Sequence, residues 1–183
     1  MAQARKFFIA ALAATAAAAA ASAAHAQHTA SVQTNSTVTV FRPITLTKNT
    51  DLSFGTVVRP LTGSGTVLIN KDDGSRSLTG SGALLNTGNP NSQAAPGRAT
   101  YTVNGEGGQT FSITVPPTFN MTRTGGSENI QVVLTPSATT GLLSNALGQA
   151  GSATFGVGGS IIVDTNSAGG AYTGSFTTTV AYN

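Results

Sequence analysis

The last residues of the chain alternate between apolar and polar side chains up to the terminus. Residues 170–183 read GAYTGSFTTTVAYN. Side chains two positions apart lie on the same face of a strand. The segment therefore predicts one terminal β-strand with a largely apolar row made of Phe176, Thr178, Val180 and Tyr182. Such a row also carries unpaired backbone groups, so we expect it to be packed in its own domain or held by a partner.

Alternation with a period of two extends over most of the chain, in runs rich in threonine, valine and isoleucine that are bounded by glycine, asparagine and serine. We predict strands at Thr37–Thr47, Asp51–Val58, Gly65–Lys71, Arg98–Asn104, Gln109–Val115, Ile130–Thr135, Gly156–Asp164 and Tyr172–Tyr182. Between the fourth and fifth, the glycine-rich run Asn104–Gly108 predicts a hairpin turn. Strands at this spacing favour an all-β fold, an immunoglobulin-like antiparallel β-sandwich, over a parallel sheet, which would need crossover helices.

Residues 1–26 resemble a cleaved secretory signal peptide. Arg5 and Lys6 precede an apolar, alanine-rich run, and Ala24–Ala26 supplies the small residues that signal peptidase recognises. The alternative, a membrane anchor, is disfavoured because alanine is only weakly apolar. We therefore expect export to the periplasm and then to the cell surface. The predicted organisation is a signal peptide at 1–26, an N-terminal extension at 27–42 and a β-sandwich domain at 43–183.

The remaining charge and the shortage of reactive side chains argue against several functions. Without residues 1–26 the chain keeps seven basic and six acidic residues and no basic stripe, so nucleic acid is not an expected partner. It has no cysteine, and its one remaining histidine is His28. We therefore expect no enzyme, no metal and no cofactor. The run Asp72–Gly74 is interpreted as a solvated turn, with weak calcium binding as the alternative.

The predicted N-terminal extension has its own alternating pattern. The even-numbered positions from Ala30 to Val40 are small or β-branched, and Val32, Val38 and Val40 are the apolar members of that row. Pro43 then interrupts the alternation, because proline cannot donate to a β-ladder. The extension is thus a candidate donor strand, separable from the domain. An ordinary edge strand of the same domain, or a frayed tail, is the alternative.

Several motifs, in their order along the chain, resemble a known family. These are Leu52–Gly55, Tyr101–Gly105, Gly158–Val163 and Gly169–Phe176. They are similar to the secreted bacterial family called domain of unknown function 4402. Both ends of the chain also resemble chaperone–usher pilus subunits of the archaic, spore-coat-U-like type. Such subunits end in an alternating strand with an aromatic residue next to last and a glycine fourteen residues from the end, here Tyr182 and Gly170.

The resemblance implies a function that the residues alone do not. It implies an incomplete immunoglobulin-like subunit of a surface pilus, held by a periplasmic chaperone, passed to an outer-membrane usher and polymerised when a neighbouring subunit donates a strand. A role in adhesion or biofilm formation would follow. Many such pilins have a cysteine pair that this chain lacks. The alternative is a self-complete, monomeric secreted β-sandwich module, for example one that binds carbohydrate, in which the extension is the domain's own strand.

Overall fold

The structure is a computed structural model that describes residues 29–85 and 95–183. The expected signal peptide and His28 lie outside these residues. The chain divides into two units, one ending at Thr39 and the other spanning Val40–Asn183. From residue 29 to residue 44 no residue belongs to a strand. The predicted strand Thr37–Thr47 is therefore wrong in its first part, because a ladder begins only after Pro43, at Thr45.

The unit Val40–Asn183 consists of antiparallel β-structure throughout its described residues, as the alternation predicted. Its strands are β1 (Thr45–Thr50), β2 (Val57–Val58), β3 (Ser64–Ile69), β4 (Arg76–Gly80), β5 (Ala83–Leu84), β6 (Ala99–Glu106), β7 (Thr110–Thr114), β8 (Thr118–Arg123), β9 (Asn129–Pro136), β10 (Thr140–Leu142), β11 (Ala150–Asp164), β12 (Tyr172–Thr173) and β13 (Thr179–Tyr182). Five of the predicted strands correspond to β3, β6, β7, β9 and β11. The predicted strand Asp51–Val58 is reduced to β2 and one isolated bridge at Ser53.

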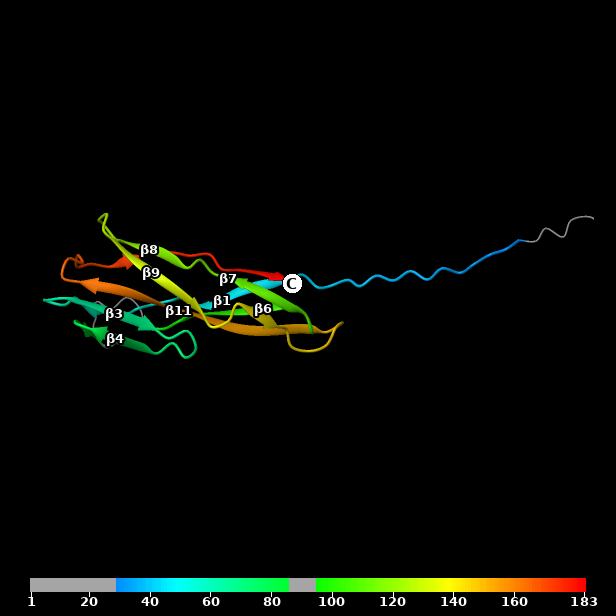
Figure 1. Ribbon diagram of the computed structural model, residues 1–183, viewed down its shortest axis with the longest axis horizontal. Helices are drawn as coiled ribbons and strands as arrows, with labels where there is room; N and C mark the ends of the chain where they lie inside the picture. Colours follow the sequence, from blue (N-terminus) through cyan, green and yellow to red (C-terminus); the bar gives the residue numbers. More distant parts are fainter. Residues whose placement is uncertain (1–28, 86–94) are drawn as a thin grey trace, which may run out of the picture. The chain divides into compact units, whose positions relative to one another are not determined.

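The long strand β11 organises the largest sheet (Figure 1). Its first half pairs with β6, from Ala150↔Glu106 to Val157↔Ala99. Its second half pairs with β3 along one edge and with β9 along the other. The eight-stranded sheet runs β1-β6-β11-β9-β8-β12, with β3 and β4 joined to it through β11, and it is curled. A second sheet has the order β10-β7-β13, and β2 pairs with β5.

The glycine-rich turn after β6 connects two sheets and does not close a hairpin. Strand β6 pairs with β1 and β11, whereas β7 pairs with β10 and β13. The predicted hairpin at Asn104–Gly108 is therefore wrong, although a turn does follow β6. Gly108 has a positive φ of 71°, which glycine adopts without strain, and its N–H donates to the Leu143 carbonyl.

The predicted C-terminal strand Tyr172–Tyr182 is broken in two. Residues 172–173 form β12 on β8, and residues 179–182 form β13 on β7, in the second sheet. The chain between them belongs to no strand, because it passes from one sheet to the other. The alternation is still expressed in burial: the four predicted row residues are partly buried and the residues between them are exposed.

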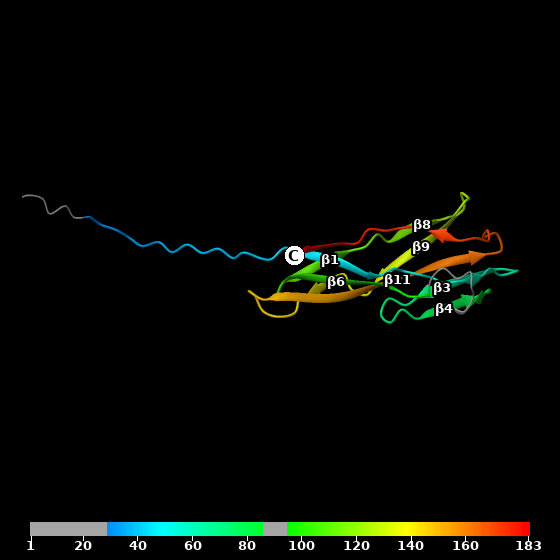
Figure 2. The same cartoon turned by 180° about the vertical axis from the view of Figure 1, so that it is seen from behind.

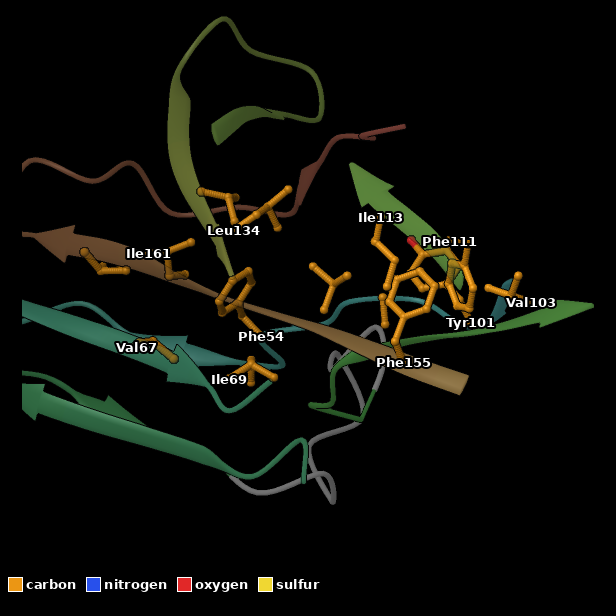
Figure 3. Packing of buried hydrophobic residues seen from close by; sticks show 14 of the residues in the cluster. Phe54, Val67, Ile69, Tyr101, Val103, Phe111, Ile113, Leu134, Phe155 and Ile161 are labelled. Carbon is orange, nitrogen blue, oxygen red and sulfur yellow. The ribbon is translucent and has the colours of Figure 1, made fainter. Parts of the chain in front are cut away.

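The core lies between the sheets and along β11 (Figure 3). Near the start of β11, Tyr101 and Phe155 stack with ring centroids 5.1 Å apart, next to Phe111 and Ile113 of the second sheet. In the other half of β11, Ile161 packs with side chains from β3 and β9. Val67, Val103, Val132 and Val157 are completely buried. The inward positions of the alternation thus form one continuous core.

Candidate functional site

The first and last strands each end a sheet, and they lie side by side. Strand β1 pairs only with β6, and β13 pairs only with β7, among the described strands. Figures 1 and 2 show β13, the red strand at the C-terminus, beside β1 and β7. We call the strip between Thr45–Thr50 and Thr179–Tyr182 the β1–β13 seam. Each of its two strands keeps one edge of backbone N–H and C=O groups without a strand partner.

The side chains beneath the β1–β13 seam are apolar but incompletely covered. Leu46, on the β1 side, and Val180 and Tyr182, on the β13 side, pack against the core while remaining partly exposed. Thr178 precedes β13, and its hydroxyl oxygen is buried without a hydrogen-bond partner among the described residues. Buried polar atoms are nearly always paired in native structures. The seam therefore combines unpaired strand edges with half-covered apolar groups, and an unsatisfied polar atom lies one residue before β13.

The hydroxyl of Tyr182 fixes one end of the seam. It accepts a hydrogen bond from the Glu106 N–H at 2.7 Å and donates one to the Arg42 carbonyl at 2.8 Å. The ring packs edge-on against Phe41, with centroids 5.9 Å apart. Gly105 makes this possible, because a Cβ at that position would collide with the Tyr182 hydroxyl. The penultimate residue thus joins the end of β13 to the chain that enters β1.

Glu106 is the one buried charged side chain among the described residues, with 2% of its surface exposed. Its carboxylate accepts hydrogen bonds from the Arg42 guanidinium at 2.9 Å, from the Arg42 N–H at 3.3 Å and from the Gly148 N–H. The bond from Gly148, followed by those from Arg42, holds the pKa of the Glu106 carboxyl below its ordinary value, against the burial that would raise it. We call Arg42, Glu106, Gly148 and Tyr182 the Glu106 network.

The structure brings only some of the predicted site residues together. Val180 and Tyr182 lie in β13, and Thr178 directly precedes it. Phe176 packs on Phe119 of β8, with ring centroids 5.2 Å apart. Gly170 lies elsewhere, before β12, where a Cβ would come within 3.0 Å of the Arg123 side chain. The assembly roles predicted for these residues stay predictions.

The three donor-strand candidates are exposed. Val32, Val38 and Val40 have 90%, 86% and 80% of their surface accessible, and none belongs to a strand. These side chains are apolar and lie on even-numbered positions, so covering them with a partner surface would be favourable for this segment. Whether they act as a donor strand stays a prediction.

Sequence analysis missed the Glu106 network. Arg42 and Glu106 are 64 positions apart in the sequence. No local motif marks the pair, because the fold alone brings the end of β6 to the chain before β1. The acidic Asp72–Gly74 run is a turn between β3 and β4, with Asp73 accepting a hydrogen bond from the Ser75 N–H.

Other kinds of site have little support in the described part of the chain. Residues 29–85 and 95–183 contain no group of three or more histidine and acidic side chains placed to hold a metal ion. No helix among them is long and apolar enough to cross a membrane. The turn at Arg123 and Glu128 holds an exposed ion pair at 2.8 Å that lowers the pKa of Glu128 to about 2.

The observed architecture defines an all-β protein of antiparallel sheets, whose first and last strands lie together with one unpaired edge each. The chain belongs to the family described as domain of unknown function DUF4402, which matches residues 44–182. The match begins just before β1 and ends at Tyr182, so it includes both strands of the β1–β13 seam. No curated protein and no solved structure matches the chain.

Proposed function

We propose that this protein is a structural subunit of a bacterial surface pilus, polymerised by donor-strand exchange between copies of the chain. The observation that carries the proposal is the β1–β13 seam, where two strand edges without strand partners lie together over half-covered apolar side chains. In this view the two sheets, connected by the turn after β6, are parts of an incomplete immunoglobulin-like sandwich. A strand inserted at the seam would complete it.

The energetics of insertion favour a strand with one apolar face. Burying apolar surface contributes about 25 cal/mol per Å², and a β-ladder would satisfy the backbone groups on both edges of the seam. Insertion therefore removes two unfavourable features of the isolated domain at once.

The occupant that we propose is the N-terminal extension of a neighbouring copy. The row of Val32, Val38 and Val40 is exposed, and its alternation presents one apolar face. Nine residues from Val32 to Val40 would span about 30 Å at roughly 3.3 Å per residue, more than the length of β1 or β13. Because the donor and the acceptor are different surfaces, each copy both gives and receives, and the contact propagates as a filament.

The proposal extends to export and to assembly partners. A subunit with an open seam needs protection before polymerisation, so we propose a periplasmic chaperone and an outer-membrane usher as partners, with residues 1–26 as the export signal. The role is structural, without catalysis. Adhesion or biofilm formation would be a property of the assembled fibre.

The test compares two variants of the exported chain that differ only in which face of the extension carries charge. Val38→Asp with Val40→Asp places carboxylates on the even-numbered row, whereas Thr37→Asp with Thr39→Asp places them on the odd-numbered row. A buried, unpaired carboxylate is costly, so the even-row variant is expected to abolish fibres and the odd-row variant to retain them. Electron microscopy of the cell surface provides the measurement.

A second arm separates this function from that of a self-complete module. The chain lacking residues 27–39 should remain a folded monomer. It should bind a synthetic peptide with the sequence of residues 27–40, which stands in for the extension of a neighbouring copy. If the truncated domain unfolds, and the intact chain is a stable monomer that never forms fibres, the extension is the domain's own strand and the proposal is wrong.

A further inference from the structure

The chain entering β1 is held to the domain by several specific contacts. At Arg42 the N–H donates to Glu106, the carbonyl accepts from Tyr182, and the guanidinium donates to Glu106 at 2.9 Å and to the Gly148 carbonyl at 3.2 Å. Phe41, one position earlier, packs on the Tyr182 ring. Thus both backbone groups and the side chain of Arg42 are fixed before the first residue of β1.

These contacts come from three parts of the domain. Glu106 ends β6, Gly148 lies in the loop between β10 and β11, and Tyr182 belongs to the last strand. The site is buried at Glu106 and reaches the surface at Arg42, whose side chain is 47% exposed. Arg42 is the one cation paired with the Glu106 carboxylate among the described residues, so its removal would leave a buried charge without a counter-ion.

The Glu106 network lies between the extension and the first strand, so it would bear force applied to the extension. The extension is joined covalently to the domain through Phe41 and Arg42, and the ladder of β1 begins three residues later, at Thr45↔Asn104. Without the network, a force on the extension would act first on the end of the β1–β6 ladder. With it, the force is distributed over β6, the β10–β11 loop and β13 before it reaches β1.

We infer that Arg42 and Glu106 are positioning residues for strand exchange. They hold the end of the donated extension to its own domain, so that tension along a fibre passes to β6, the β10–β11 loop and Tyr182 and does not separate β1 from β6. The physiological role of this anchor rests on the proposed function. The anchor itself is a property of the single chain and is tested on the single chain.

The experiment is single-molecule pulling of the mature chain with two attachment geometries. The chain has no natural cysteine, so paired cysteine handles are unique. One geometry uses Ser31→Cys with Ser127→Cys, which loads the domain through the extension. The reference geometry uses Thr62→Cys with Ser127→Cys, which bypasses it. All three positions are exposed.

Arg42→Ala and Glu106→Gln are expected to lower the rupture force more in the extension geometry, with an early release of the β1 segment, than in the reference geometry. Lys71→Ala, which breaks the ion pair with Asp72 in the turn between β3 and β4, is the matched control and should change neither. Arg42→Lys keeps the charge but has one nitrogen in place of the two that donate to Glu106 and to the Gly148 carbonyl, so it should give a smaller loss and serves if Arg42→Ala does not fold.

An equal loss of force in both geometries would mean that the Glu106 network only stabilises the fold, and an unchanged force in the extension geometry would mean that it bears no tension; either result overturns the inference. Both are distinguishable from failure of the proposed function, which is read from fibres on cells. Fibres on cells that express the wild-type chain, together with a lower rupture force of the Arg42→Ala chain in the extension geometry, would support both the proposed function and the anchor.

Discussion

The Tyr182 hydroxyl lies 2.8 Å from the carbonyl oxygen of Arg42, a residue 140 positions earlier in the chain. This bond joins the beginning of the domain to its end. Because the same hydroxyl also accepts a hydrogen bond from the Glu106 N–H, it bridges two backbone groups that would otherwise need separate partners.

Replacing Tyr182 by Phe should therefore destabilise the domain through the loss of the hydroxyl alone. The ring contact with Phe41 remains, but the Glu106 N–H and the Arg42 carbonyl lose their partner. We expect a loss of about 1–3 kcal/mol in the free energy of unfolding. Urea denaturation measures it, and Tyr172→Phe, whose hydroxyl makes one bond to the Ala168 carbonyl, is the control with a smaller expected loss. Equal losses would show that bridging gives Tyr182 no special role.

Gly105→Ala should lower the stability of the domain by disturbing the hydrogen bonds of the Tyr182 hydroxyl. The added Cβ would meet the Tyr182 hydroxyl and would come within 3.0 Å of Leu143, so one of them must move. Overpacking of this kind costs roughly 1–3 kcal/mol. Gly169→Ala is the matched control, since a Cβ there has no neighbour within 4 Å. Thermal unfolding of the two variants compares them, and a Gly105→Ala variant as stable as Gly169→Ala would contradict the close approach.

Acid should destabilise the protein in a defined pH window. The pKa of Glu128 is lowered from 4.5 to about 2, chiefly by the side-chain hydrogen bond from Arg123, and the pKa of Glu106 is also lowered. A depressed folded-state pKa means that the contribution to stability is present above about pH 4.5 and is lost as pH falls toward about 2. Melting temperatures across this window should fall for the wild type and fall less steeply for Glu128→Gln. Parallel curves would argue against the Glu128 contribution.

Charging the exposed row of the extension should leave the isolated domain intact. Val38 and Val40 are 86% and 80% exposed, so Val38→Asp with Val40→Asp should change the free energy of unfolding by less than about 0.5 kcal/mol. Denaturation of the purified monomer checks this independently of any fibre phenotype. A large loss would mean that these side chains are already buried in the monomer.

The alternation of the sequence predicted the all-β class and five strands because inward-facing valine, isoleucine and phenylalanine recur at every second position. It did not predict which strands pair. The turn after β6 has hairpin chemistry, yet β6 and β7 enter different sheets, since pairing depends on contacts far apart in the chain. For the same reason the apolar pattern at Phe176 and Tyr182 was correct, while the single strand predicted through both was wrong.

The candidate site was predictable only in its C-terminal part. Val180 and Tyr182 were identified from alternation and from resemblance, and both lie at the β1–β13 seam. Arg42 and Glu106 were not, because a single arginine and a single glutamate 64 positions apart have no pattern that distinguishes them from solvated charges. Gly105 is the one residue in the sequence consistent with the close approach of the Tyr182 hydroxyl, because it has no Cβ. A glycine in a predicted turn, however, already has a simpler explanation, which is its conformational freedom.

The central place of β11 determines when the chain is able to fold. Its residues, Ala150–Asp164, supply the partner edges for β3, β6 and β9, all of which are synthesised earlier. A polypeptide emerging from its N-terminus can therefore form the β1–β6, β3–β4 and β8–β9 pairs, but not the sheet that unites them, before β11 has been synthesised. Because β11 joins these pairs through contacts between residues far apart in the sequence, we expect the complete sheet to form late in folding.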